Sequence, residues 1–497
     1  MKEVISNKTL ALIIILILIA GYAAYYMKTK KSSEDIKTKM EAIVSYKQAN
    51  EYFYAGDYNN AIKKFKDSIK LQPLNPKAYE KLGYTYKLQG QYEESLKYLN
   101  KSIEQNPEDF RTYMELADTY LKTDDYDKAQ SVIDKALKES SENKDESIAY
   151  NFKGLAYLNQ KEYDKAIDNI TKALKIDPVY IEARTNLGLV YLRKDDYENA
   201  LKHFKTAHEL SKRLPLPQYY IAYTYYKQEK FSRSLAQLER IKHLTPDYIK
   251  SYYLCGVIYA KQRSLNKTIN NFTRMLQIDP GSVSASEYNE MLQEVLDILL
   301  KLKQNNKNKV ELYDLVATIY TRQNKPQEAI NIYKEALKNG LDYPEIHNNL
   351  GSLYIVIRDY EMAVDEYKKA VGKRPDEALF HYGLASVYER QKDYNAAIKE
   401  LKETLSIDPE FSIAEVKLAN TYKAIKDYEN AFIHYRKALQ TNPSEAYAYL
   451  GLGELYQKQD LIKDAVWNYN QFIKYAENTP KKDEILQKVE KLSKEIN

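Results

Sequence analysis

The sequence predicts an all-α protein: a right-handed α-solenoid of about twelve helix pairs preceded by one N-terminal transmembrane helix. The first observation behind this prediction is a tyrosine that recurs every 34 residues along most of the chain. The second is a set of small residues at fixed distances from that tyrosine. The third is an uncharged apolar run near the N-terminus. With 14 Gly and 14 Pro in 497 residues, the composition argues against an all-β protein with many tight turns.

The recurring tyrosine defines the repeat, and its spacing is 34 residues except for one step of 37 and one of 61. The twelve positions are Tyr52, Tyr86, Tyr120, Tyr157, Tyr191, Tyr225, Tyr259, Tyr320, Tyr354, Tyr388, Tyr422 and Tyr456. Three residues before each tyrosine stands Gly or Ala, as in Gly188, and nine residues after it stands Ala, Ser or Thr, as in Ala200. Small residues at two fixed points let the two helices of a repeat approach closely.

Residues 378–411 illustrate the helical pattern of one repeat. His381, Leu384, Ala385 and Tyr388 follow the i, i+3, i+4, i+7 spacing of one helix face. A second helix should end before Pro409, because proline has no backbone N–H and restricts the residue before it. One such helix pair cannot bury its apolar face alone, so neighbouring pairs must stack.

This combination of period, small positions, aromatic position and closing proline resembles the tetratricopeptide repeat over residues 42–282 and 310–479. The closing proline occurs in eight repeats, as Pro73, Pro107, Pro178, Pro246, Pro280, Pro375, Pro409 and Pro443. The resemblance implies that the first helices line a concave face. It also implies that outward residues of those helices bind peptide segments of other proteins.

Departures from the repeat predict the remaining organisation. Residues 283–309 are expected to form an interrupting helix, because Met291, Leu292, Val295, Leu296, Leu299 and Leu302 share one face. Asn143–Glu146 is expected to be a lengthened loop. The predicted segments are an N-terminal tail (1–8), the transmembrane helix (9–27), a linker (28–41), a lobe of seven repeats (42–282), the interrupting helix, a lobe of five repeats (310–479) and a C-terminal capping helix (480–497).

The apolar segment predicts a membrane anchor. Its 19 uncharged residues would span roughly 28 Å as a helix, close to the hydrocarbon thickness of a bilayer. A cleaved signal peptide is the alternative, although the run is long for one and Gly21-Tyr22-Ala23 is only a weak cleavage site. Five lysines follow the segment within residues 28–39 and two precede it, which favours cytoplasmic repeats on a bacterial inner-membrane protein.

Nothing in the sequence predicts catalysis, a cofactor or a metal site. Neighbouring His347 and His381 are expected to be packing residues and not a shared metal site, and His203 and His434 are expected at an outer position of second helices. Acidic pairs such as Asp195-Asp196 fall between paired helices, where Asp favours turns and helix starts. The net charge of +5 is interspersed, which argues against nucleic-acid binding.

The predicted partner-binding groove lies on the first helices of residues 147–282. It combines apolar and tyrosine side chains with a basic margin that would favour an acidic segment. Its members are Leu155, Leu158, Leu189, Leu192, Arg193, Tyr219, Tyr223, Tyr226, Lys227, Tyr253, Val257 and Lys261. The alternative is that these residues are ordinary helix surface for this type of repeat.

Two functional hypotheses follow. The first is a membrane-tethered scaffold or adaptor that binds segments of other proteins on the concave face. The second is a non-catalytic regulatory or assembly subunit of a membrane enzyme or envelope-biogenesis complex. Anchored tetratricopeptide proteins that regulate lipopolysaccharide synthesis carry a four-cysteine knuckle, and the single Cys255 cannot supply one. Homo-oligomerisation stays open.

Overall fold

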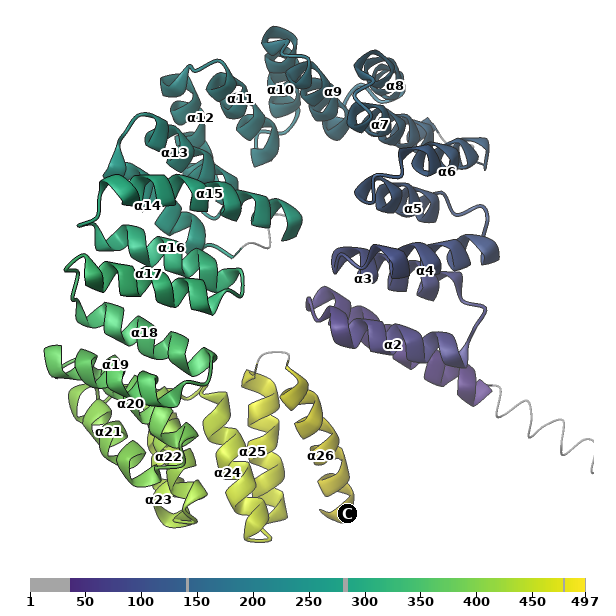
Figure 1. The fold of residues 1–497 in the computed structure, drawn as a ribbon. Helices are drawn as coiled ribbons and strands as arrows, with labels where there is room; N and C mark the ends of the chain where they lie inside the picture. The colour runs from purple at the N-terminus through teal and green to yellow at the C-terminus, as the bar shows by residue number, and fades with distance from the viewer. Residues whose placement is uncertain (1–35, 140–142, 280–284, 477–478, 497) are drawn as a thin grey trace, which may run out of the picture. The chain divides into compact units, whose positions relative to one another are not determined.

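The structure is a computed structural model that describes residues 36–139, 143–279, 285–476 and 479–496 (Figure 1). These residues form α-helices joined by short turns, and no strand occurs among them. The chain divides into two compact units, Met1–Ser234 and Leu235–Asn497, here called unit 1 and unit 2. The division falls inside one helix.

Unit 1 begins, in its described part, with a helix over residues 36–54. The helices that follow are α2 (Tyr58–Leu71), α3 (Pro76–Leu88), α4 (Tyr92–Gln105), α5 (Phe110–Lys122), α6 (Tyr126–Glu139), α7 (Asn143–Asn159), α8 (Tyr163–Ile176), α9 (Ile181–Arg193), α10 (Tyr197–Leu210) and α11 (Pro215–Lys227). Helix α12 (Phe231–Leu244) crosses the division.

Unit 2 continues with six further helix pairs, an unpaired helix and a final helix. They are α13 (Ile249–Lys261), α14 (Leu265–Gln277), α15 (Ala285–Asn305), α16 (Val310–Arg322), α17 (Pro326–Lys338), α18 (Pro344–Val356), α19 (Tyr360–Lys373), α20 (Ala378–Arg390), α21 (Tyr394–Ile407), α22 (Ser412–Ala424), α23 (Tyr428–Thr441), α24 (Ala446–Lys458), α25 (Ile462–Tyr475) and α26 (Pro480–Ile496). The predicted all-α repeat fold is therefore confirmed, and α15 and α26 lie where the sequence predicts the interrupting helix and the capping helix.

The two helices of each repeat are joined by the same turn. One residue per turn has a positive φ, and it is glycine only at Gly56 and Gly90. At Asp195 φ is +57°, and the next residue, Asp196, accepts a hydrogen bond from Asn199 N at 3.1 Å. Asp and Asn tolerate the left-handed region better than other residues with side chains, and Asp is a strong N-cap. The predicted turn and helix-start role of the acidic pair is confirmed.

The closing prolines end the second helices as predicted. Helix α8 ends at Ile176, two residues before Pro178, and α21 ends at Ile407, two residues before Pro409. Pro280 lies outside the described residues.

The core contains a column of large buried side chains that is not evident from the sequence. Sixteen residues after each small first-helix position stands a large residue that is at most 4% exposed, and the type varies among Phe, Leu, Ile and Tyr. Gly188 shows why the first position is small, because a Cβ atom there would lie 2.6 Å from Phe204 Cε1. The recurring tyrosine is only half-buried in most repeats. The column of large residues, and not the tyrosine, fills the space beside the small positions.

Helix α15 is held against its neighbours by its apolar face and by polar contacts. Leu292, Val295 and Leu299 are buried, as the sequence predicts. The Arg322 guanidinium of α16 donates to the Tyr288 hydroxyl of α15 at 2.6 Å and to the Leu276 carbonyl of α14. The C-terminal helix α26 buries Ile485 against the last repeat.

Two predictions for connecting segments have different outcomes. The predicted loop Asn143–Glu146 is wrong, since these residues form the first turn of α7. Asp145 and Glu146 there face the positive end of the helix dipole, which favours helix over loop. The predicted transmembrane helix, residues 9–27, lies outside the described residues, and no helix within them is long and apolar enough to cross a membrane.

Candidate functional site

The predicted groove residues of unit 1 lie on α7, α9 and α11. Leu192 is buried with Ala200 and Phe204, so it belongs to the core. Tyr219 is buried as well, at 7% exposed. Leu155, Leu158, Leu189, Tyr223 and Tyr226 are half-buried, and Arg193 and Lys227 are exposed. The strip on unit 1 is therefore less accessible than the sequence register indicates.

The tyrosines of α11 pack on one another. The ring centroids of Tyr219 and Tyr223 are 6.2 Å apart, those of Tyr223 and Tyr226 are 5.9 Å apart, and Tyr226 lies 6.2 Å from Phe231. Half-buried aromatic rings of this kind still offer contact area at low entropy cost. The strip stays a proposed binding surface.

The predicted groove residues of unit 2 lie on α13, and part of that surface is covered. Val257 is 3% exposed, while Tyr253 is half-buried and Lys261 is exposed. The Tyr253 hydroxyl donates to the Glu294 carboxylate of α15, and Lys250 pairs with Glu287 of α15 at 2.6 Å. Helix α15 thus lies along the face of α13 that the register assigns to a ligand.

A different apolar row is exposed in the last repeats of unit 2. Leu379, Ile413 and Tyr447 are the second residues of α20, α22 and α24, and they are 49%, 52% and 52% exposed. We call these three residues the apolar row. Figure 1 shows their helices in succession toward the C-terminus. The signal was present in the sequence, because the resemblance implies that outward residues of the first helices bind peptide segments.

The helices that carry the apolar row are tied to one another by ion pairs. Lys417 of α22 lies 2.9 Å from Glu389 of α20. Lys423 of α22 lies 2.7 Å from Glu454 of α24. Partial burial lowers the pKa of this half-buried lysine, but Glu454 and Tyr435 together raise it above its usual value. The apolar row therefore lies on three first helices that are joined to one another by ion pairs.

Carboxylates flank the apolar row. Glu377 precedes Leu379, Glu410 precedes Ile413 and Glu445 precedes Tyr447 by two or three residues. Arg374 pairs with Glu345 at 2.7 Å and also reaches Glu377 at 3.8 Å. Acidic groups outnumber basic ones in this set, so the row favours an apolar segment with basic residues.

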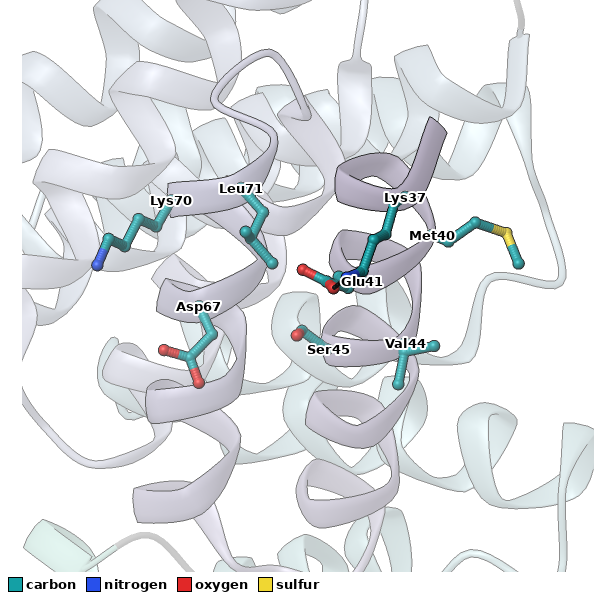
Figure 2. A pocket seen from close by; sticks show the side chains of 8 residues that line it. All are labelled: Lys37, Met40, Glu41, Val44, Ser45, Asp67, Lys70 and Leu71. Carbon is teal, nitrogen blue, oxygen red and sulfur yellow. Dashed lines mark ion pairs between the residues drawn. The ribbon is translucent and has the colours of Figure 1, made fainter. Parts of the chain in front are cut away.

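A third exposed surface is the outer face of the first helix pair. A groove of 660 Å³ lies between the helix over residues 36–54 and α2 (Figure 2). Ile36, Met40, Ile43 and Val44 are 52–61% exposed and share one helix face. Figure 2 shows Met40 projecting away from α2, whereas Lys37 and Glu41 project toward it. No earlier repeat is described that would cover this face.

The chemistry-bearing residues form no recognisable catalytic arrangement in the part of the chain that the structure describes. Cys255 is fully buried, and burial raises its pKa to about 11. His347 pairs with Asp342 and Glu366, and His381 pairs with Glu400. Among the described residues, no group of three or more metal-ligating side chains converges. The predicted outer position of His203 and His434 is wrong, since each stacks on a first-helix tyrosine at 5.4 Å.

Comparisons with known proteins address the repeats directly. Family models described as tetratricopeptide repeat match residues 317–377, 357–410 and 416–445. A model described as the ARM repeat of tetratricopeptide repeat protein 21 matches residues 54–206. A comparison with curated proteins found no match.

Solved structures with a similar arrangement are distant. MamA from Desulfovibrio magneticus is 23% identical with a TM-score of 0.31, over 35% of this chain and 96% of its own. A tetratricopeptide repeat protein from Parabacteroides merdae is 19% identical with a TM-score of 0.43, over 52% and 99%. The Cut9–Hcn1 hetero-tetramer of the APC/C is 14% identical with a TM-score of 0.35, over 89% and 95%.

The family identification therefore rests on the matched models, on the helix pairs and on the positions of the small, aromatic and proline residues. The matched segments of this chain, residues 54–206, 317–410 and 416–445, belong to the tetratricopeptide-repeat family.

Proposed function

We propose that this protein is a non-catalytic scaffold whose last repeats bind a segment of another protein. The observation that carries the proposal is the apolar row, three large side chains about half exposed at equivalent places in three consecutive repeats. Exposed apolar residues that recur at equivalent positions mark interaction surfaces more often than single scattered apolar residues do. The flanking carboxylates favour a partner segment with apolar residues and neighbouring Lys or Arg.

Binding of defined peptides tests this proposal. A displayed library of 15-residue peptides should, after selection on the full chain in detergent, be enriched in sequences that combine apolar and basic residues. The triple variant Leu379→Ala, Ile413→Ala and Tyr447→Ala should bind the selected peptides at least about tenfold more weakly, because central apolar contacts often contribute about 2 kcal/mol each.

Matched variants decide where the site lies. Leu74, Val179 and Leu244 are exposed apolar residues outside the row, so replacing them with Ala should leave binding unchanged. Tyr223→Ala with Tyr226→Ala tests the strip on α11. If that pair weakens peptide binding and the row variant does not, the site is the tyrosine strip and the row proposal is wrong.

The proposal includes a membrane tether formed by residues 9–27. The exposed face with Ile36, Met40 and Val44 supports it, because this apolar face begins only nine residues after the predicted anchor and carries Lys37 and Lys39 beside it. The cytoplasmic placement of the repeats, and the alternative role as a regulatory or assembly subunit, belong to the same proposal.

The tether predicts that the mature protein keeps its N-terminus. Intact mass measurement of the protein extracted from membranes should give a chain that still contains residues 9–27. A mature chain that starts near Ala24 would instead identify a cleaved signal peptide and an exported protein.

A further inference from the structure

Three consecutive repeats of unit 2 share a polar contact inside the helix pair. In each, a histidine and a glutamate 19 residues apart join the first helix to the second at the same repeat position. The pairs are His347 Nδ1–Glu366 Oε2 at 2.6 Å, His381 Nδ1–Glu400 Oε2 at 2.7 Å and His434 Nδ1–Glu415 Oε2 at 2.5 Å. In the third pair the two residue types have exchanged helices, so the pair is retained while its order is not.

The contacts of His347 require its charged form. Nδ1 faces Glu366, and Nε2 faces Asp342 Oδ1 at 2.7 Å. A neutral imidazole carries a single N–H, whereas an ionised carboxylate only accepts hydrogen bonds. Only the imidazolium donates to both carboxylates. The ring is 4% exposed, so water cannot substitute for either bond.

His381 is held in the same way by different atoms. Its Nδ1 faces Glu400, and its Nε2 lies 3.0 Å from the Pro375 carbonyl oxygen. A carbonyl oxygen also only accepts, so the imidazolium again satisfies both acceptors. The residue is 6% exposed.

The neighbouring charges agree with a charged His347. Hydrogen bonding to Glu366 raises the pKa of His347, burial opposes this, and Asp342 adds to the rise. Burial would raise the pKa of Glu366, but the hydrogen bonds from His347 and Lys369 lower it overall. Lys373 and then His347 lower the pKa of Asp342. The facing groups are therefore two carboxylates, each shared with one lysine.

His203 in unit 1 provides an internal comparison. It occupies the second-helix position of His434 and stacks on Tyr191 at 5.4 Å, as His434 stacks on Tyr422 at 5.4 Å. The first-helix position opposite His203 holds Arg184, where the third pair has Glu415. Burial, with further contributions from Arg184 and Lys202, lowers the pKa of His203 to about 4.

We propose that His347 makes the α18–α19 helix pair acid-strengthened: its charged imidazole joins the two helices and Asp342, and this contact is released as the pH rises. A histidine whose pKa is raised in the folded state contributes its full stabilisation when the pH is below the ordinary pKa of about 6.5. That stabilisation is lost as the pH rises through the pKa that the histidine has in the folded state. The carboxylates with lowered pKa lose their contribution only in the acid range, below about 4.

The effect should extend beyond one repeat. In a solenoid each repeat is stabilised mainly by its neighbours, so weakening the α18–α19 pair also loosens α20, which packs on α19. Helix α20 carries Leu379 of the apolar row. The inference goes beyond the proposed function, because it concerns stability and holds whether or not the row binds a partner.

Two measurements on the full chain test the proposal. The chain contains six histidines, so ¹³C-labelled histidine signals can be assigned by single His→Gln variants. At pH 7 the signal of His347 should be that of imidazolium, while His203 should be neutral. A neutral signal from His347 at pH 7 would overturn the proposal without the need for any variant to fold.

Hydrogen exchange measured by mass spectrometry supplies the second test. After correction for intrinsic exchange rates, peptides from α18–α19 should lose protection by roughly tenfold between pH 6 and pH 8, the equivalent of one pKa unit, relative to peptides from α8–α10. The variant His347→Gln should remove this difference, and His203→Gln should not. Equal protection at both pH values would overturn the proposal.

Discussion

Replacing Gly188 by leucine should lower the free energy of unfolding of its repeat by about 1–3 kcal/mol, the usual cost of overpacking a core. A Cβ atom at this position would already lie 2.6 Å from Phe204 Cε1, and the larger side chain adds three more carbon atoms. Phe204 has little room to move aside, because it is fully buried and its ring stacks on Tyr220 with the centroids 5.2 Å apart. Urea unfolding, with hydrogen exchange of α9 and α10 as the local measure, would give the change.

Gly372 is the matched control for this substitution. It lies inside α19, yet a Cβ atom there would meet nothing within 4 Å. Glycine in a helix costs about 1 kcal/mol relative to alanine, so Gly372→Leu should be neutral or stabilising. If the two variants change stability equally, the packing role assigned to Gly188 is wrong.

The repeat register was predictable from the sequence because its causes are local. Helix periodicity, the closing Pro178 or Pro409 and the acidic turn at Asp195 act within a few residues, and the structure confirms each of them. The buried column that contains Phe204 was harder to recognise. Its residue type changes between repeats, since any side chain that fills the space beside Gly188 or its equivalents is accepted.

The candidate site was less predictable because burial depends on neighbouring helices. The register identifies the side of α9 that carries Leu192, but it does not reveal that Phe204 and Ile221 pack around this side chain. It also assigns Tyr253 to the ligand-binding side of α13, but it does not reveal that α15 packs against that side. The apolar row follows the same register, and it is exposed because the described residues place nothing over Leu379 or Ile413.

The histidine pairs show a second limit of a single sequence. His347 occupies a packing position, as predicted, but its partner Glu366 lies 19 residues away on another helix. Neither residue alone suggests that the two form a pair. The third repeat does suggest it, because glutamate stands there on the first helix (Glu415) and histidine on the second (His434), so the pair is kept while the two residue types exchange places.

Replacing Tyr367 by alanine should have the largest effect on stability, about 3–5 kcal/mol, as expected for removing a large buried aromatic side chain. The residue is 3% exposed and lies between two glycines of successive first helices. A Cβ atom at Gly351 of α18 would lie 2.7 Å from Tyr367 Cδ2, and one at Gly383 of α20 would clash with the opposite edge of the ring. The hydroxyl also forms a 2.7 Å hydrogen bond with Ser352 Oγ.

Because the Tyr367 ring lies between two repeats, its removal should change how the chain unfolds. The cavity left by Tyr367→Ala removes contacts to both glycines, so it weakens the coupling between neighbouring repeats as well as one helix pair. Urea unfolding should therefore separate into two transitions, and peptides from α18 and α20 should exchange faster. Tyr367→Phe keeps the ring and loses only the hydrogen bond, at a cost of about 1 kcal/mol. If Tyr367→Ala costs no more than Tyr367→Phe, the ring does not couple the two repeats.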